Sequence, residues 1–155
     1  MNEALCNRIR EAFAGVTLGS GIGLQQAQGL DDYENEAICA RYRASDEKED
    51  WTRISASELN RCNSSLSFFD AEGMRFHLPA YLIADLHGTY EFGMAFCLTQ
   101  SHDYSRYFEL LSDAQREVVR EFLLHISKEA DYEWDRPQIL RALHEYWIDP
   151  HLPKK

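Results

Sequence analysis

The 155-residue sequence lacks the segments that direct a protein into or across a membrane. No basic segment followed by an apolar run opens the chain, and no apolar stretch approaches the ~18–20 residues needed to span a bilayer. The four cysteines are each separated by more than twenty residues, which excludes the Cys-x-x-Cys spacing of zinc and redox motifs. We therefore expect a cytoplasmic protein with no membrane partner, whose cysteines are buried free thiols.

Basic residues are also in short supply. The chain has 26 acidic and 16 basic side chains, a net charge of −10 and a pI of about 5.0. Nucleic acids and anionic membranes are recognised through clustered Lys and Arg, so we expect no direct nucleic-acid binding. The acidic excess favours a basic partner, or serves solubility alone. A hydrophobic content of 45% can supply the core of one globular domain over residues 1–155.

The motifs of common catalytic and metal sites are missing. None of the six histidines belongs to a His-Glu-x-x-His or His-x-His motif, and no Gly-x-Ser-x-Gly elbow is present. The glycine-rich residues 15–23 lack the lysine of a phosphate-binding loop. His125 and Glu129, four residues apart, are expected to face solvent. We predict no catalytic motif, no metal site and no cofactor.

Most of the chain shows helical periodicity. Apolar residues at spacings of three and four predict helices over residues 2–14, 24–44, 57–62, 112–129 and 135–147, the second with a break near Gly29 or Asn35. Residues 89–99 are ambiguous, and we favour a helix there.

One stretch has a different pattern. Residues 74–78 alternate apolar and polar side chains after a turn-like Asp70-Ala71-Glu72-Gly73, and with residues 66–69 they predict a β-hairpin. Pro79 suits the first turn of a helix through Leu86. The predicted fold class is α+β, a predominantly α-helical single domain with one small antiparallel β-hairpin.

The acidic residues are concentrated between Asp31 and Asp50. Eight carboxylates and three basic residues give this stretch a charge of −5, half of the total. It could be a solvated face, a divalent-metal site or a docking surface, and the metal interpretation lacks the spacing of a calcium loop. Interleaved aromatics favour docking, although Tyr33 also lies on an apolar stripe and could be core. The candidate contacts are Asp31, Asp32, Glu34, Glu36, Asp46, Glu47, Asp50 and Trp51.

The motifs Leu30-Asp31-Asp32-Tyr33, Asp50-Trp51 and Ser67-Phe-Phe-Asp-Ala-Glu-Gly-Met-Arg-Phe-His-Leu-Pro-Ala-Tyr81 carry a resemblance. Over residues 9–87 the chain resembles an uncharacterised family of small bacterial proteins. The resemblance implies a cytoplasmic bacterial domain, and the family has no agreed enzymatic activity or catalytic residues to carry over. Arg75 of this block could instead pair with Asp31 or Asp32 and hold the scaffold together.

In size and charge the chain is also similar to immunity proteins that neutralise antibacterial toxins, including the secreted nuclease effectors of type VI secretion. We therefore predict an immunity-type protein that docks its acidic surface on a basic toxin. The alternative is a small hydrolase or ligand-binding enzyme that pairs His77, His87 or His102 with a carboxylate. A third possibility is a homodimer whose acidic face is only solvated.

Overall fold

The computed structural model describes residues 2–99 and 104–148, and every regular element in these ranges is a helix. The α-helices are α1 (Glu3–Ala12), α2 (Leu24–Asp31), α3 (Glu36–Ser45), α4 (Ala56–Arg61), α5 (Ala71–Leu86), α6 (Ala95–Thr99), α7 (Tyr104–Phe108), α8 (Asp113–Ile126) and α9 (Arg136–Ala142). Three 3₁₀ segments and a final π-helical turn complete the set: η1 (Trp51–Arg53), η2 (Asn63–Ser67), η3 (Ala130–Asp135) and η4 (Leu143–Trp147).

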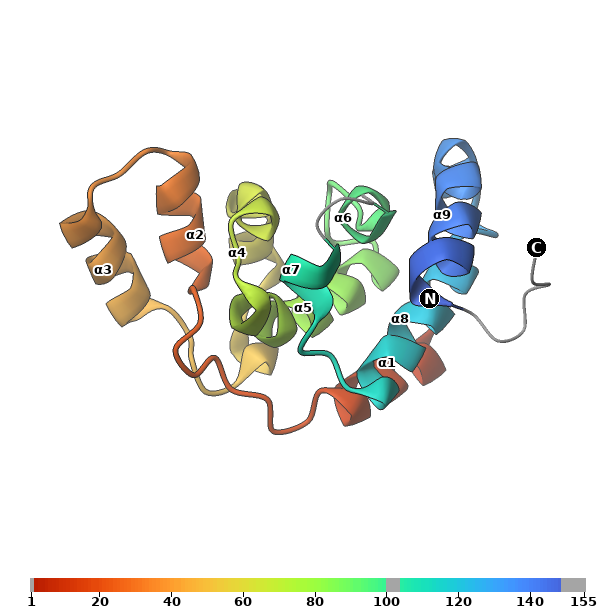
Figure 1. The fold of residues 1–155 in the computed structure, drawn as a ribbon, viewed down its shortest axis with the longest axis horizontal. Helices are drawn as coiled ribbons and strands as arrows, with labels where there is room; N and C mark the ends of the chain where they lie inside the picture. The colour runs from red at the N-terminus through yellow and green to blue at the C-terminus, as the bar shows by residue number, and fades with distance from the viewer. Residues whose placement is uncertain (1, 100–103, 149–155) are drawn as a thin grey trace.

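Helix α5 lies in the middle of the molecule, with the other helices around it (Figure 1). An antiparallel pair, α2 and α3, forms one end of the molecule, and α9 lies toward the other. Helix α1 packs beside α8 and also contacts α5. One cluster of buried apolar side chains extends from Leu5 of α1 to Trp147 of η4. None of the helices in the described ranges is long and apolar enough to cross a membrane.

The predicted α+β fold class is wrong, because the expected hairpin is a helix. The described ranges contain no β-strand, and residues 74–78 lie within α5. The carboxylate of Asp70 accepts a hydrogen bond from the backbone N–H of Gly73 at 2.8 Å. Asp70 is therefore the N-cap of α5 and not a turn residue of a hairpin.

The misleading alternation has a physical cause in the position of α5. Ten of its sixteen residues are buried, including the consecutive run Phe76–Leu82. A helix that is enclosed on most sides shows no narrow apolar stripe, so its period is hard to distinguish from that of a strand. Pro79 lies inside this helix and not at its start.

The helices expected elsewhere are present, except that the helix favoured over residues 89–99 is confined to α6 (Ala95–Thr99). The predicted segment 24–44 is divided into α2 and α3, and Asn35, one of the two expected break points, is the N-cap of α3. Its side chain accepts a hydrogen bond from the N–H of Ile38 at 2.9 Å. Ser112 and Gln115 form a capping box at the start of α8, within the predicted helix over 112–129. The predicted helix over 135–147 is divided between α9 and η4.

Candidate functional site

Four of the predicted contact residues gather where α2 turns into α3. We call residues 31–36 the acidic tip; it contains Asp31, Asp32, Glu34 and Glu36, and no Lys or Arg. Asp32, Glu34 and Glu36 are exposed, and Asp31 is half-buried. Tyr33 lies among them with 96% of its surface exposed. The possibility that Tyr33 is a core residue is thereby excluded.

Tyr33 also has an unusual backbone. Its φ is +59°, in the left-handed region that residues other than Gly, Asn and Asp seldom adopt. The turn therefore holds an aromatic ring in water at some cost in backbone strain. Strain of this kind is concentrated at functional sites, where the surrounding structure maintains it.

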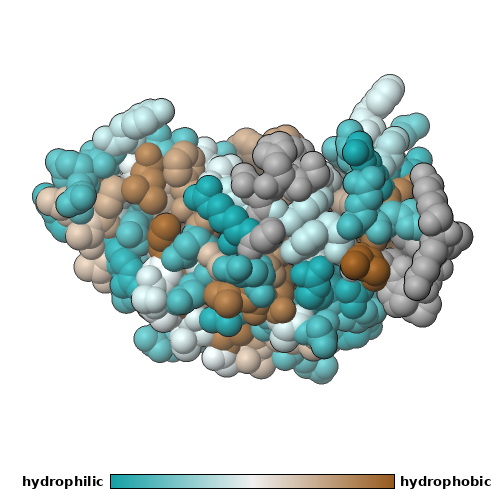
Figure 2. All heavy atoms as spheres, viewed as in Figure 1, coloured by the Kyte–Doolittle hydropathy of each residue, from teal (hydrophilic) through white to brown (hydrophobic). Residues whose placement is uncertain are grey.

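Close packing between α2 and α3 supports the acidic tip. A Cβ added to Gly29 would lie 2.9 Å from the ring of Tyr42, so only a glycine lets the two helices approach this closely. Cys39 is the buried residue of α3, and the rest of that helix is exposed or half-buried. In Figure 2 hydrophilic residues cover much of the outer end at α3, beside a hydrophobic patch over α2.

Asp46 has a structural role. It is 6% exposed, and its two carboxylate oxygens accept hydrogen bonds from the backbone N–H groups of Gln25 and Gln26, at 2.9 and 3.1 Å. The carboxylate thus caps the first turn of α2 from outside that helix. Burial raises the pKa of Asp46, although the two backbone hydrogen bonds act in the opposite direction.

The neighbouring predicted contacts also hold the local chain together. Glu47 accepts hydrogen bonds from two backbone N–H groups, and the first of them, from Glu49, is the main cause of its lowered pKa. Asp50 accepts hydrogen bonds from the hydroxyl and the N–H of Thr52, and the hydroxyl bond is the main cause of its lowered pKa. Trp51 is buried and donates its indole N–H to the carbonyl of Phe13 at 3.0 Å. We therefore leave Asp46 and Trp51 out of the contact surface.

Arg75 makes neither of the ion pairs considered for it. Asp31 and Asp32 instead accept hydrogen bonds from the side chain of Gln28, at 3.5 and 3.3 Å. The Nε atom of Arg75 is buried and has no hydrogen-bond partner within the described part of the chain. The acidic tip is consequently not neutralised by Arg75.

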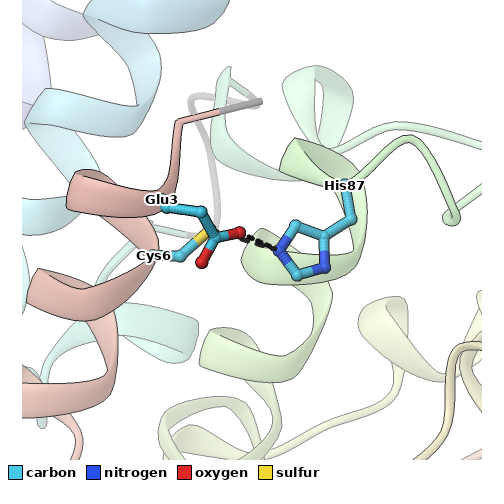
Figure 3. A group of neighbouring side chains, drawn as sticks. All are labelled: Glu3, Cys6 and His87. Atoms are coloured by element: carbon cyan, nitrogen blue, oxygen red, sulfur yellow. Dashed lines mark hydrogen bonds and ion pairs between the residues drawn. The ribbon is translucent and has the colours of Figure 1, made fainter.

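Of the three histidines considered for an enzyme, His87 meets a carboxylate. Its Nε2 lies 2.9 Å from Oε1 of Glu3 and 3.6 Å from Sγ of Cys6 (Figure 3). Glu3 and Cys6 come from the first turns of α1, and His87 is the C-cap of α5. His77 is buried in the core, and His102 lies outside the described residues. Because His87 and Cys6 are 81 residues apart, no local motif could have revealed this group.

The group does not have the geometry of a catalytic triad. In a triad the acid and the nucleophile contact opposite nitrogens of the imidazole. Here Glu3 and Cys6 both approach Nε2. Burial, followed by the negative charge of Glu3, raises the pKa of the Cys6 thiol, whereas an activated cysteine needs a lowered one. Cys6 is therefore poorly placed to act as a nucleophile. The three side chains instead bring potential metal-donor atoms close together.

Two hollows lie near histidines. His87 contributes to the lining of a cavity of about 200 Å³, together with Arg10 of α1 and residues of η1, α4 and α5. A groove of about 550 Å³ lies between the end of α5 and the end of α8, lined in part by five carboxylate residues and no Lys or Arg. We call it the acidic groove; its carboxylates are Asp85, Glu91, Glu129, Asp131 and Asp135.

Asp85, in the lining of the acidic groove, accepts two hydrogen bonds. The hydroxyl of Tyr132 and the N–H of Met94 both donate to Asp85, and burial raises the pKa of this carboxyl. Phe92 at its wall is 60% exposed. Sequence reasoning missed the groove because its carboxylates come from segments about forty residues apart and form no dense run.

The comparison with family models decides the classification. The family of unknown function DUF6714 matches residues 1–151. The chain belongs to this family. The predicted resemblance to an uncharacterised family is confirmed, and the match extends well beyond residues 9–87. Membership of DUF6714 brings no assigned activity or site residues. No curated protein and no solved structure matches the chain.

Proposed function

We propose that the protein is an immunity-type binding protein that neutralises a cognate antibacterial toxin, a secreted nuclease effector above all. The acidic tip docks on the basic surface with which such a toxin binds phosphates. The exposure of Tyr33 among four carboxylates is the observation that carries this proposal. The protein acts in the cytoplasm, where such a toxin reaches its nucleic acid.

The chemistry of the acidic tip suits a basic protein partner. Tyrosine is enriched among the residues that dominate binding energy, because its ring buries a large area and has few rotamers to lose. Carboxylates around such an anchor attract a basic surface over several ångströms and accelerate association. The partly exposed Leu30 adds apolar area next to the turn. The tip thus combines an anchor with a steering field.

The test is a protection assay with a toxin encoded next to this gene. Co-expression of the wild-type chain should restore growth, and the triple variant D32N/E34Q/E36Q should fail to do so. The matched control neutralises three carboxylates that are also exposed but lie elsewhere, as E11Q/E109Q/E133Q. Both variants remove the same number of negative charges from the protein. Docking through the acidic tip would be contradicted if the tip variant still protected the cells. It would also be contradicted if the tip variant and the control variant both failed to protect them.

A second candidate function is a small hydrolase or ligand-binding enzyme. It is favoured by the contact of 2.9 Å between His87 and Glu3, and by the cavity of about 200 Å³ that His87 helps to line. Turnover of model esters or phosphate esters that disappears in H87Q and persists in H125Q would support it. Sedimentation of the isolated protein as a dimer would instead support the homodimer alternative.

A further inference from the structure

We propose that Glu3, Cys6 and His87 form a binding site for a thiophilic divalent transition metal, with Zn²⁺ as the best fit. The carboxylate, thiol and imidazole donor atoms all lie within 4.8 Å of one another. Figure 3 shows the three side chains pointing toward a common point between α1 and α5. This proposal does not rest on the proposed toxin binding.

The distances fit a tetrahedral ion. Zinc binds sulfur at about 2.3 Å and nitrogen at about 2.0 Å, which places the two donors about 3.5 Å apart in a tetrahedron. Sγ of Cys6 and Nε2 of His87 are separated by 3.6 Å. Glu3 is the closer donor to Nε2, at 2.9 Å, and its side chain is 55% exposed, so it can move outward by the few tenths of an ångström required.

The donor set indicates the class of metal. A thiolate and an imidazole favour zinc and similar ions over Mg²⁺ and Ca²⁺, which prefer oxygen donors. Three protein donors leave one tetrahedral position for water or an external ligand, as in catalytic zinc sites. The side chains of Glu3 and His87 are partly exposed, so an ion can reach them from solvent, whereas Cys6 is buried.

The surroundings hold the donors in place. Glu3 and Cys6 are one turn apart on α1, so the helix fixes their spacing. The second oxygen of Glu3 lies 3.7 Å from the guanidinium of Arg10, which in turn donates a hydrogen bond to Asn7. Such support around a ligating carboxylate is usual in metal sites. On binding, Cys6 coordinates as the thiolate and releases its proton to solvent, while neutral His87 carries its proton on Nδ1.

The chain contains a matched control pair. His125 and Glu129 approach each other at 3.4 Å, with exposed fractions of 30% and 53%, against 30% and 55% for His87 and Glu3. No cysteine belongs to that second pair in the described part of the chain. Any affinity of a surface histidine–glutamate pair for metal should therefore be equal at the two places.

The experiment titrates Co²⁺ into the full-length protein after treatment with a chelator, under reducing conditions. One equivalent of Co²⁺ should produce a thiolate-to-cobalt charge-transfer band and the strong visible absorption of a tetrahedral ion, and Zn²⁺ should displace both. Variant C6S should lose the charge-transfer band. Variants E3Q and H87Q should weaken binding at least tenfold. The controls H125Q and C97S should bind as the wild type does.

Two results would overturn the proposal: no charge-transfer band at one equivalent of Co²⁺, or a band that persists in C6S. Because Cys6 is buried, C6S is compared with the wild type by circular dichroism without metal. If C6S does not fold, E3Q provides the decision, since the Glu3 side chain is half-exposed. Unchanged affinity in E3Q would then equally refute the site.

Discussion

His77 illustrates how burial alone sets the behaviour of a titratable residue. Its ring stacks on Phe69 at a centroid distance of 4.4 Å, and its Nδ1–H donates to the carbonyl of Gly73 at 2.7 Å. Its Nε2 is buried without a hydrogen-bond partner among the described residues. A proton added to Nε2 would bring an unpaired charge into the core. Burial therefore lowers the pKa of His77 to about 4.

The lowered pKa of His77 predicts that acid destabilises the protein. Between about pH 6.5 and pH 4 the unfolded chain binds a proton at this residue and the folded chain does not, so stability is lost as the pH falls. From about pH 7 to pH 5 the loss at this residue is about 2 kcal/mol. Urea unfolding at the two pH values measures it, and H77L should lack this contribution.

The comparison of H77L with the wild type removes opposing effects. The raised pKa values of Asp46 and Asp85 act in the opposite direction on acidification, but they are common to both proteins. Equal pH dependence in H77L and the wild type would show that His77 is not the source.

We expect Tyr33 to lower the stability of the fold and to strengthen binding to the proposed toxin. Replacing it by Gly removes the left-handed strain of an L-residue at φ +59°, which is worth about 1 kcal/mol. The ring contributes little packing, because it is 96% exposed. We expect Y33G to raise the unfolding midpoint in urea and to lose protection against the toxin. A variant that loses stability would show that the ring supports the fold.

At the scale of the element, α5 shows what a sequence pattern can and cannot specify. Phe76, Leu78 and Tyr81 of this helix are fully buried. The hairpin prediction failed because it took the apolar residues to repeat with the period of a strand. A helix enclosed on most sides presents apolar residues in every direction, so the helical period is hidden. Asp70 followed three residues later by Gly73 fits both a turn and a helix start. The hydrogen bond from the N–H of Gly73 to the Asp70 carboxylate and the helical bond from the N–H of Met74 to the Asp70 carbonyl distinguish them.

The Asp70 cap should be worth more than an ordinary one. Its Oδ1 accepts from the N–H of Gly73 at the start of α5 and also, at 3.0 Å, from the N–H of Ile22 in the loop between α1 and α2. D70A removes both bonds, and we expect a loss of about 2–3 kcal/mol in the free energy of unfolding. The control N35A removes a single exposed cap of α3 and should cost about 1 kcal/mol. Equal losses in urea unfolding would contradict the double role.

At the scale of the whole molecule, the sequence indicated where charged residues cluster but not which residues of the cluster are buried. Residues 31–36 are contiguous and lie in one turn, so their clustering could be predicted from spacing alone. Asp46 and Trp51 carry the same local pattern, yet tertiary contacts with Gln25, Gln26 and Phe13 bury them. The group of Glu3, Cys6 and His87 is formed by the packing of α1 on α5, which no local pattern encodes.

The described part of the molecule carries two acidic surfaces, the acidic tip and the acidic groove. The tip carries its charge mainly on exposed side chains, so in the proposed complex its field would steer association. In the groove, Asp85 is hydrogen-bonded, and the remaining charge faces a concave wall. We expect D32N/E34Q/E36Q to reduce the association rate constant with the toxin at low salt about tenfold. E91Q/E129Q/D131N should reduce it less.

High salt discriminates between the two surfaces. At about 0.5 M salt the Debye length falls to roughly 4 Å, so the exposed charges of the acidic tip no longer act at a distance. The association rate constants of the wild type and the tip variant should then converge, while dissociation should remain faster in Y33G, because its lost contact is apolar. Surface plasmon resonance at low and high salt measures both rates. A tip variant that is slower by the same factor at every salt concentration would show that these carboxylates make short-range contacts and do not steer the partner.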